Sequence, residues 1–243
     1  QIGGHLVKLD VPREETFVSN RVRHAIRSHI VSWVRPDGTF AARKLEAFSD
    51  QGAYASHGHS ICATGVGAFP QLYPCDNIEA DGYTGFTNKP AAGAMRGYGI
   101  PQAMWAVECH TDEVAKKVGM NPVAFRRKNL MPVGFKDEFS KNELYTDTFN
   151  QCMDKGMKEM DYERKYKEYQ NQTGDIRRGI GMSVFWYNTA VWPISLETSS
   201  CRMVLNQDGS LQVQVGETEI GQGADTAYTQ MAADVVGVRL DQV

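Results

Sequence analysis

The sequence predicts an α+β fold in which antiparallel hairpins and a sheet pack with several helices. Strand-like and helical segments occur in blocks rather than in strict alternation. Turn sequences at residues 35–38 (RPDG) and 206–209 (NQDG) each separate two β-rich segments. The 243 residues, 42% of them hydrophobic, suffice for a core in one domain or in two subdomains, at about residues 1–175 and 176–243.

The first half of the chain contains three segments with strand character. Residues 25–34 and 39–48 flank the first turn and predict a hairpin. Residues 78–86 predict a further strand. Between them, residues 52–67 are rich in small side chains and predict a loop or an irregular helix.

Helices are expected after residue 100. Apolar residues at helical spacing predict a helix over residues 101–118, with Gly119 as its terminator. Asn121 is expected to cap a helix over residues 122–129, and Thr148 a third helix with an apolar stripe. Strands are then predicted at residues 179–187, 201–205 and 211–215, followed by a helix over residues 224–236.

Charge and composition exclude several classes of protein. The net charge of −3 without a basic stripe argues against a nucleic-acid partner. No apolar run approaches 18 residues, so no membrane-spanning helix is expected. The five cysteines form no C-x-x-C pair, which argues against a zinc or iron–sulfur site within this chain and favours the cytoplasm. Because the chain starts at Gln1 rather than Met, we expect a fragment of a larger protein.

Two glycine-flanked loops could carry chemistry. The first glycine loop (residues 93–99, GAMRGYG) leads into a predicted helix, whose amino-terminal end favours anions. Arg96 adds a planar guanidinium that matches phosphate or carboxylate. The second glycine loop (residues 218–223, TEIGQG) places the amide of Gln222 between two glycines, which suits an oxo group or a pterin edge. Taken alone, each loop is more often a structural turn than a binding site.

Other polar residues give weaker indications. His57 and His59 could ligate a metal, but without a third ligand loop hydrogen bonding is favoured. His110 lies on the apolar stripe of its helix and is expected to be a hydrogen-bonded core residue. Glu217 and Glu219 could perform acid–base work or simply belong to a strand edge that enters the loop.

Taken together, the motifs resemble the molybdenum-binding subunit of the xanthine dehydrogenase and aldehyde oxidase family. Residues 87–102 (TNKPAAGAMRGYGIPQ) are similar to the family's T-N-x5-A-[FM]-R-G-[FY]-G-x-P-Q motif, and residues 216–226 (GETEIGQGADT) to its G-x-T-E-[IM]-G-Q-G-x-x-T block. Glu108, Arg126 and Asn129 match the helix pair between them. Residues 52–59 (GAYASHGH) and 177–181 (RRGIG) look like bacterial xanthine dehydrogenases in particular.

The resemblance implies a molybdenum–molybdopterin cofactor and a parent oxidoreductase that hydroxylates an N-heterocycle such as a purine with oxygen from water. It implies partners as well: the rest of the molybdenum subunit, and FAD and 2Fe-2S clusters on partner subunits or domains. Arg96 and Gly97 would contact the cofactor from one loop, and Gly221, Gln222 and Gly223 from the other. Tyr98 would stack on the substrate ring. We therefore predict that the two glycine loops converge on one cofactor.

Departures from the family pattern limit these expectations. The catalytic glutamate and a third pterin loop are expected beyond Val243, so no catalytic residue or metal ligand is assigned here and the isolated chain is expected to be inactive. Thr64 stands where many purine-oxidising members have an arginine, so an aldehyde is the runner-up substrate. The first glycine loop has no cysteine, which disfavours the carbon monoxide dehydrogenase branch. A nucleotide-binding glycine-loop enzyme and a non-catalytic assembly module remain alternatives.

Overall fold

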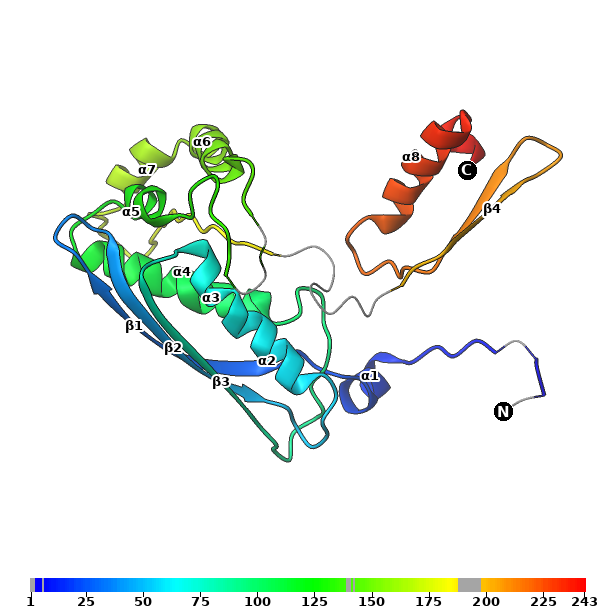
Figure 1. The fold of residues 1–243 in the computed structure, drawn as a ribbon, viewed down its shortest axis with the longest axis horizontal. Helices are drawn as coiled ribbons and strands as arrows, with labels where there is room; N and C mark the ends of the chain where they lie inside the picture. Colours follow the sequence, from blue (N-terminus) through cyan, green and yellow to red (C-terminus); the bar gives the residue numbers. More distant parts are fainter. Residues whose placement is uncertain (1–2, 6, 139–140, 142, 188–197) are drawn as a thin grey trace. The chain divides into compact units, whose positions relative to one another are not determined.

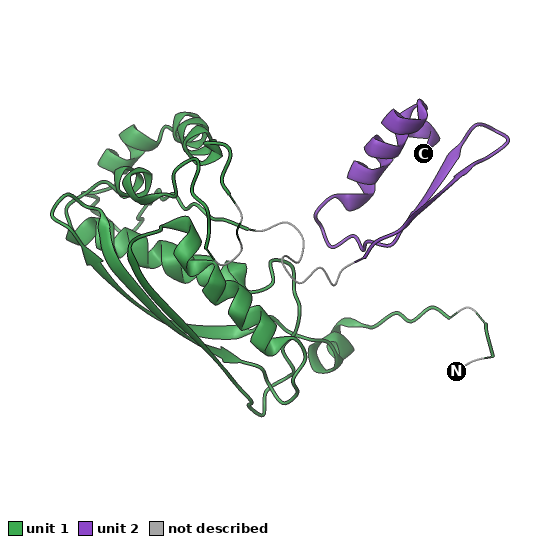
Figure 2. Cartoon of the chain, in the orientation of Figure 1, with its two compact units in different colours: residues 1–187 green, residues 188–243 purple. Residues whose placement is uncertain are grey.

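The computed structural model describes residues 3–5, 7–138, 141, 143–187 and 198–243 (Figure 1). The chain divides into two compact units, residues 1–187 and residues 188–243 (Figure 2). The division falls after residue 187, whereas the sequence suggested a boundary near residue 175. Each unit is described by itself. No helix among the described residues is long and apolar enough to cross a membrane.

A three-stranded sheet forms the centre of unit 1. Strands β1 (Ala25–Val34) and β2 (Phe40–Asp50) are antiparallel, which confirms the predicted hairpin. Strand β3 (Asn77–Gly85) confirms the third predicted strand and pairs with β2 in parallel. The reason is the connection: parallel neighbours need a crossover, and helices α2 (Gly58–Gly67) and α3 (Phe69–Leu72) supply it. Residues 58–67 are therefore a regular helix, not a loop.

Among the described residues, unit 1 contains five more helices, three of them where the sequence predicted them. Gly119 ends the first of these three with φ +71°, and the side chain of Asn121 accepts hydrogen bonds from Val123 N and Ala124 N at the start of the second. Asp147, not Thr148, caps the next predicted helix by accepting from Asn150 N. The five helices are α1 (Arg13–Ser19), α4 (Ile100–Lys117), α5 (Pro122–Asn129), α6 (Thr148–Met160) and α7 (Tyr162–Glu168).

The core of unit 1 lies between the sheet and the helices α2, α3 and α4, which cover one face of it (Figure 1). Along β2, alternate side chains point to this face, among them Leu45 and Ala47. Arg43 points there too, and it is 1% exposed. Its guanidinium lies 4.1 Å from the ring of Phe69 and donates to the carbonyl of Tyr73 at 2.8 Å. Burial lowers the pKa of Arg43 to about 10.

A buried ion pair joins α4 to α5. Arg126 donates from Nε to Glu108 Oε2 at 2.8 Å and from Nη1 to Asp112 Oδ1 at 2.6 Å. Tyr73 donates to the other carboxylate oxygen of Glu108 at 2.5 Å. Burial lowers the pKa of Arg126, but Glu108 and the other partners more than offset this and hold the pKa above its ordinary value. The guanidinium therefore stays charged inside the core.

The predicted strand at residues 179–187 is wrong: these residues form no strand in the described structure. The backbone N–H of Val184 donates at 2.7 Å to Glu108 Oε2, so a buried carboxylate takes the place of a strand partner at that position. Val184 packs with Val123, Met153 and Tyr162 in a second, smaller core cluster. Of the apolar stripe predicted for α6, only Met153 is buried, whereas Cys152 and Met160 are exposed.

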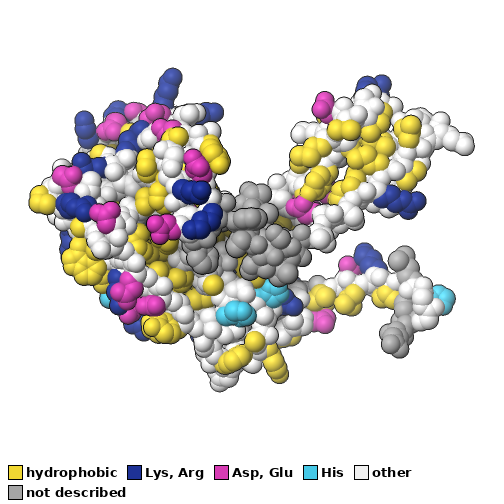
Figure 3. Space-filling view, viewed as in Figure 1, with side chains coloured by type: hydrophobic (Ala, Val, Ile, Leu, Met, Phe, Trp, Pro, Cys, Tyr) yellow, Lys and Arg dark blue, Asp and Glu magenta, His cyan; other side chains and the backbone are white. Residues whose placement is uncertain are grey.

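Unit 2 consists of a hairpin and a helix, as predicted. Strands β4 (Cys201–Leu205) and β5 (Leu211–Val215) are antiparallel, and α8 (Ala224–Val236) and a short 3₁₀ helix (Leu240–Gln242) follow. Figure 3 shows hydrophobic side chains gathered on the face of this unit in view. Large apolar side chains that are exposed here are Met203, Leu205, Ile220, Met231, Val235, Val236 and Leu240. Apolar surface of this extent is typical of an interaction face.

Candidate functional site

The first glycine loop is a series of tight turns that ends at the amino terminus of α4. Tyr98 N donates to Met95 O at 2.9 Å, and Ile100 N donates to Gly97 O at 3.0 Å. Gly97 and Gly99 have φ values of +96° and +95°, and Tyr98 between them has φ +44°. Three consecutive positive φ values are costly for ordinary residues, so the glycines are a structural requirement of this turn.

The loop is pressed against α2. A Cβ atom at Gly99 would lie 2.2 Å from the carbonyl oxygen of Ile61, and a Cβ at Gly65 would lie 3.0 Å from the carbonyl oxygen of Gly99. The backbones of the loop and of α2 are thus in direct contact. This packing gives the loop one defined position on unit 1.

Residues 21–24, which precede β1, support the loop from another side. Arg23 donates from Nη2 to the carbonyl of Arg96 at 2.7 Å and from Nη1 to Gln102 Oε1 at 3.4 Å. Gln102 in turn donates to the carbonyl of His24 at 3.1 Å, and Gly93 N donates to Val22 O at 3.0 Å. Sequence reasoning missed Arg23, because nothing in the spacing of residues 23 and 96 indicates that they meet.

The Thr87-Asn88 end of the motif is anchored to β2. Thr87 Oγ1 donates to Asp50 Oδ1 at 2.6 Å, and Lys89 Nζ donates to Asp50 Oδ2 at 2.8 Å. Gly52 N donates to the same carboxylate at 2.9 Å. The hydrogen bonds from Lys89, Thr87 and Gly52 hold the pKa of Asp50 well below its usual range. Asp50 thus fixes the start of the segment that leads into the loop, and the hydrogen bond from Gly93 N to Val22 O fixes its end.

Arg96 and Tyr98, both predicted site residues, have different surroundings. The side chain of Arg96 is exposed. Tyr98 is half-buried, and its hydroxyl lies 2.8 Å from Nδ1 of His57, with the two rings edge to face at 5.9 Å. Hydrogen bonding of His57 within its loop environment is confirmed, and His59 Nε2 lies 3.4 Å from Ser60 Oγ. Within the described ranges, no group of three or more His, Cys, Asp and Glu side chains is placed to hold a metal ion.

The second glycine loop folds around its own carboxylate. Gly221 and Gly223 have φ values of +92° and +83°. The backbone N–H groups of Gly221, Gly223 and Asp225 donate to the carboxylate of Glu219 at 2.5, 3.2 and 3.3 Å. These bonds, Gly223 first, lower the pKa of Glu219. The loop is an anion-binding turn at the start of α8 that holds an anion of its own.

The amide of Gln222 is also engaged within this loop. Its Oε1 accepts from Ile220 N at 2.6 Å, and its Nε2 donates to Thr218 O at 2.9 Å and to Glu217 Oε1 at 3.2 Å. Tyr228 donates to Glu217 as well. Glu217 and Glu219 are therefore hydrogen-bond acceptors that shape the loop.

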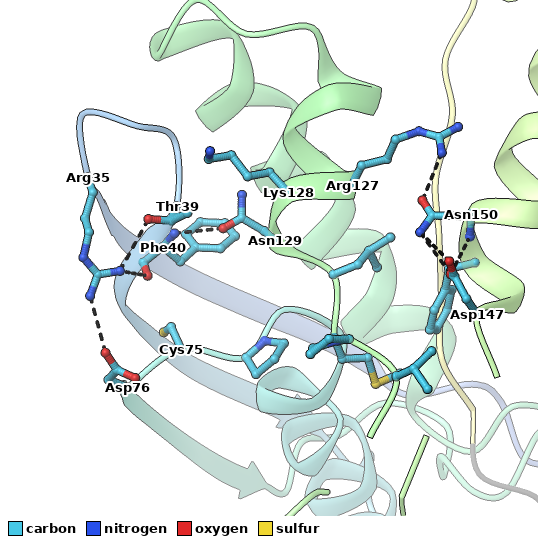
Figure 4. Close-up of a pocket in the computed structure, with 16 residues that line it drawn as sticks. Arg35, Thr39, Phe40, Cys75, Asp76, Arg127, Lys128, Asn129, Asp147 and Asn150 are labelled. Atoms are coloured by element: carbon cyan, nitrogen blue, oxygen red, sulfur yellow. Dashed lines mark hydrogen bonds and ion pairs between the residues drawn. The ribbon is translucent and has the colours of Figure 1, made fainter. Parts of the chain in front are cut away.

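A cavity of about 610 Å³ in unit 1 is lined by none of the predicted site residues (Figure 4). It lies between the β1–β2 turn, the end of α5 and the start of α6. Its cations have protein partners: Arg35 lies 3.4 Å from Asp76, and Arg127 donates to Asn150 Oδ1 at 3.0 Å (Figure 4). The walls thus mix paired charges with apolar side chains and indicate no particular ligand.

Comparison with protein families tests the resemblance that the motifs of the two loops suggested. Residues 2–130 and residues 155–243 match two models described as molybdopterin cofactor-binding domain, and each model includes one of the loops. The chain belongs to the molybdopterin cofactor-binding domain family. The family prediction from the motifs is confirmed.

Known members of the family match over almost the whole chain. The xanthine dehydrogenase molybdenum-binding subunit of Escherichia coli O157:H7 is 41% identical over 243 residues, which are 100% of this chain and 32% of that protein. The chain therefore spans about a third of the length of this relative.

Solved structures agree with the fold. The aldehyde oxidoreductase of Desulfovibrio gigas superposes with a TM-score of 0.76 at 26% identity, over 90% of this chain and 24% of that one. The quinoline 2-oxidoreductase of Pseudomonas putida 86 gives a TM-score of 0.76 at 24% identity, over 96% of this chain and 31% of that one. The α+β fold of this chain is thus shared with these two oxidoreductases over the matched region.

Proposed function

We propose that this chain is a section of the molybdenum-binding subunit of a xanthine dehydrogenase-type hydroxylase. In this proposal it supplies two loops of the molybdopterin pocket and part of the substrate pocket. The complete enzyme hydroxylates an N-heterocycle such as a purine, takes its oxygen from water, and passes electrons to 2Fe-2S clusters and FAD on partner subunits or domains. Family membership and the 41% identical relative support this proposal.

The single observation that carries the proposal is the shape of the first glycine loop. Loop backbone lies against α2 and residues 21–24, while the side chain of Arg96 is exposed. A Cβ at Gly97 would lie 2.5 Å from Pro101 Cγ, so the turn requires a glycine at this position. A fixed backbone with an exposed guanidinium fits an anionic cofactor.

The second glycine loop fits the same cofactor through different groups. Its N–H groups already bind the Glu219 carboxylate, which shows that the backbone geometry suits an oxygen ligand. The Gln222 amide is held in one orientation by Ile220 N and Thr218 O. We propose that Gly221, Gln222 and Gly223 contact the pterin side of the cofactor.

In this scheme the residues of this chain bind and orient. Arg96 holds an anionic group of the cofactor, Gly97 lets the cofactor approach the main chain, and Tyr98 stacks on the substrate ring. The molybdenum group, when bound, supplies the oxygen-transfer and electron-accepting chemistry. We assign no catalytic base among these 243 residues and expect no turnover by them alone.

An aldehyde is the second candidate substrate. Thr64, at the position where many purine-oxidising members have an arginine, lies on α2 and donates to the carbonyl of Ser60 at 2.9 Å. It therefore supplies no cation for a purine oxygen. The structural likeness to the aldehyde oxidoreductase of Desulfovibrio gigas supports the same alternative.

Substitution of Arg96 by Ala in the full-length enzyme tests the cofactor role. A lost charge-assisted hydrogen bond lowers cofactor affinity by about tenfold to a hundredfold, so the purified variant should contain less molybdenum and less pterin. Metal analysis and pterin fluorescence measure both. Arg164→Ala, an exposed arginine on α7, is the matched control and should keep its cofactor. Full cofactor content in the Arg96 variant would contradict the proposal. Stabilisation of the chain by ATP or NAD would favour a nucleotide-binding loop instead.

A further inference from the structure

Tyr98 adopts a backbone conformation that its neighbours must maintain. Its φ of +44° is unusual for a residue with a side chain, and such residues persist only where the surroundings determine them strongly. The flanking glycines allow the turn, but they do not orient the phenol ring. The Tyr98 hydroxyl lies 2.8 Å from His57 Nδ1, and this contact orients the ring.

His57 itself is firmly placed. It is the N-cap residue of α2, and its carbonyl accepts from Ile61 N at 2.9 Å. The next residue, Gly58, is buried, and a Cβ there would lie 2.0 Å from the side-chain oxygen of Gln51 on the sheet side. The start of α2 is therefore seated on the sheet, and the imidazole projects from a rigid position.

We infer that His57 is a positioning residue that fixes the ring of Tyr98 for the recognition of planar, ring-containing substrates. The inference rests on the proposed function, because it assumes that Tyr98 faces the substrate. It assigns a role to one histidine of the His57-Gly58-His59 sequence, which the motif resemblance left without a function. In His59, two residues further on, Nε2 lies 3.4 Å from Ser60 Oγ.

The contact works in either tautomer of the imidazole. If the proton is on Nε2, the hydroxyl of Tyr98 donates to Nδ1; if it is on Nδ1, the imidazole donates to the phenolic oxygen. In both cases the bond and the edge-to-face contact, with ring planes at 82°, restrict rotation of the phenol. A ring held in advance loses less entropy when a flat substrate stacks on it.

The kinetic test uses the full-length holoenzyme with xanthine and benzaldehyde as ring substrates and acetaldehyde as a substrate without a ring. We expect His57→Ala to raise KM for the ring substrates about threefold to tenfold, the equivalent of one hydrogen bond, with little change in kcat. KM for acetaldehyde should not change. Tyr98→Phe should raise KM for the ring substrates in the same way. His57→Gln keeps a hydrogen-bonding side chain and should have a KM close to that of the wild type, and His59→Ala should behave as wild type.

A second measurement does not depend on turnover. In the chain labelled with ¹³C at tyrosine Cζ, the Tyr98 resonance, assigned through Tyr98→Phe, should shift in His57→Ala and stay in place in His59→Ala. A Tyr98 resonance that does not shift in His57→Ala would overturn the inference. So would an equal loss of activity of His57→Ala toward all three substrates together with a lower thermal midpoint of unfolding. If the wild-type holoenzyme oxidises none of the three substrates, the proposed function fails, and the tyrosine spectrum alone decides whether His57 positions Tyr98.

Discussion

The first glycine loop is held by residues far away in the sequence, whereas the second is held by its own neighbours. Arg23 reaches across 73 positions to the carbonyl of Arg96, and Gly99 packs on α2. In the second loop, the longest-range bond to Glu219 spans 6 positions, from Asp225 N. The first loop can therefore form only when unit 1 is folded, while the second needs little more than the start of α8.

The largest expected effect comes from removing the buried ion pair of unit 1, because the first loop depends on the folded unit and the second does not. Arg126→Ala leaves Glu108 buried without its cation and should cost about 3–5 kcal/mol of unfolding free energy. We expect backbone amides of the first loop to lose protection in hydrogen exchange, while those of the second loop keep theirs. Arg164→Ala removes an exposed ion pair on α7 and should cost less than about 1 kcal/mol. Equal loss of protection in both loops would refute the difference.

A pair of glycine substitutions sharpens the comparison. Gly99→Ala introduces a Cβ 2.2 Å from a backbone oxygen at φ +95°. Because backbone strain and the steric collision both destabilise the variant, we expect the free energy of unfolding to fall by more than about 2 kcal/mol. Gly223→Ala meets no atom within 4 Å at φ +83°. It should cost only the conformational strain, about 1 kcal/mol. Urea unfolding of the two variants measures this; equal effects would show that the contact with α2 contributes nothing.

The smallest effect concerns the charge inside the second loop. The pKa of Glu219 lies below its ordinary value of 4.5, because Gly223, Asp225 and Gly221 donate to the ionised form. A lowered folded-state pKa stabilises the loop above pH 4.5, and this contribution disappears as the pH falls through the folded-state pKa. Glu219→Gln should therefore destabilise the protein at pH 7, and its unfolding midpoint should fall less than that of the wild type between pH 5 and pH 3. Parallel pH profiles would contradict this.

The parts of the fold that depend on local sequence were predictable. Turn residues located both hairpins, and Asn121 and Gly119 located helix ends, because capping and turn formation involve only near neighbours. The strand predicted at residues 179–187 failed for a tertiary reason, since Glu108 provides an acceptor that the local pattern does not reveal. The small-residue segment 58–67 gave no periodic signal, and it is helical because it packs between the sheet and α4.

The residues of the candidate site that lie in the motifs could be found from the sequence, whereas the residues that support them could not. Motif resemblance picked out Arg96, Tyr98 and Gln222, but their roles as cofactor and substrate contacts stay predictions. Their supports, Arg23 and His57, come from other segments, and a single sequence does not show which segments meet. Glu219 had been weighed as an acid–base candidate, and the structure gives it three backbone donors instead.

The parallel pairing of β2 with β3 has a consequence for the order of folding. Leu45 stands opposite Ile30 in the hairpin and opposite Ala80 across the crossover, so one neighbour arrives early and the other only after α2 and α3 have closed the connection. The first glycine loop follows β3 in the sequence and rests on α2. We therefore expect the loop to reach its native form only after β3 and α2 are in place, and the nascent chain to bind no anion there until the sheet is complete.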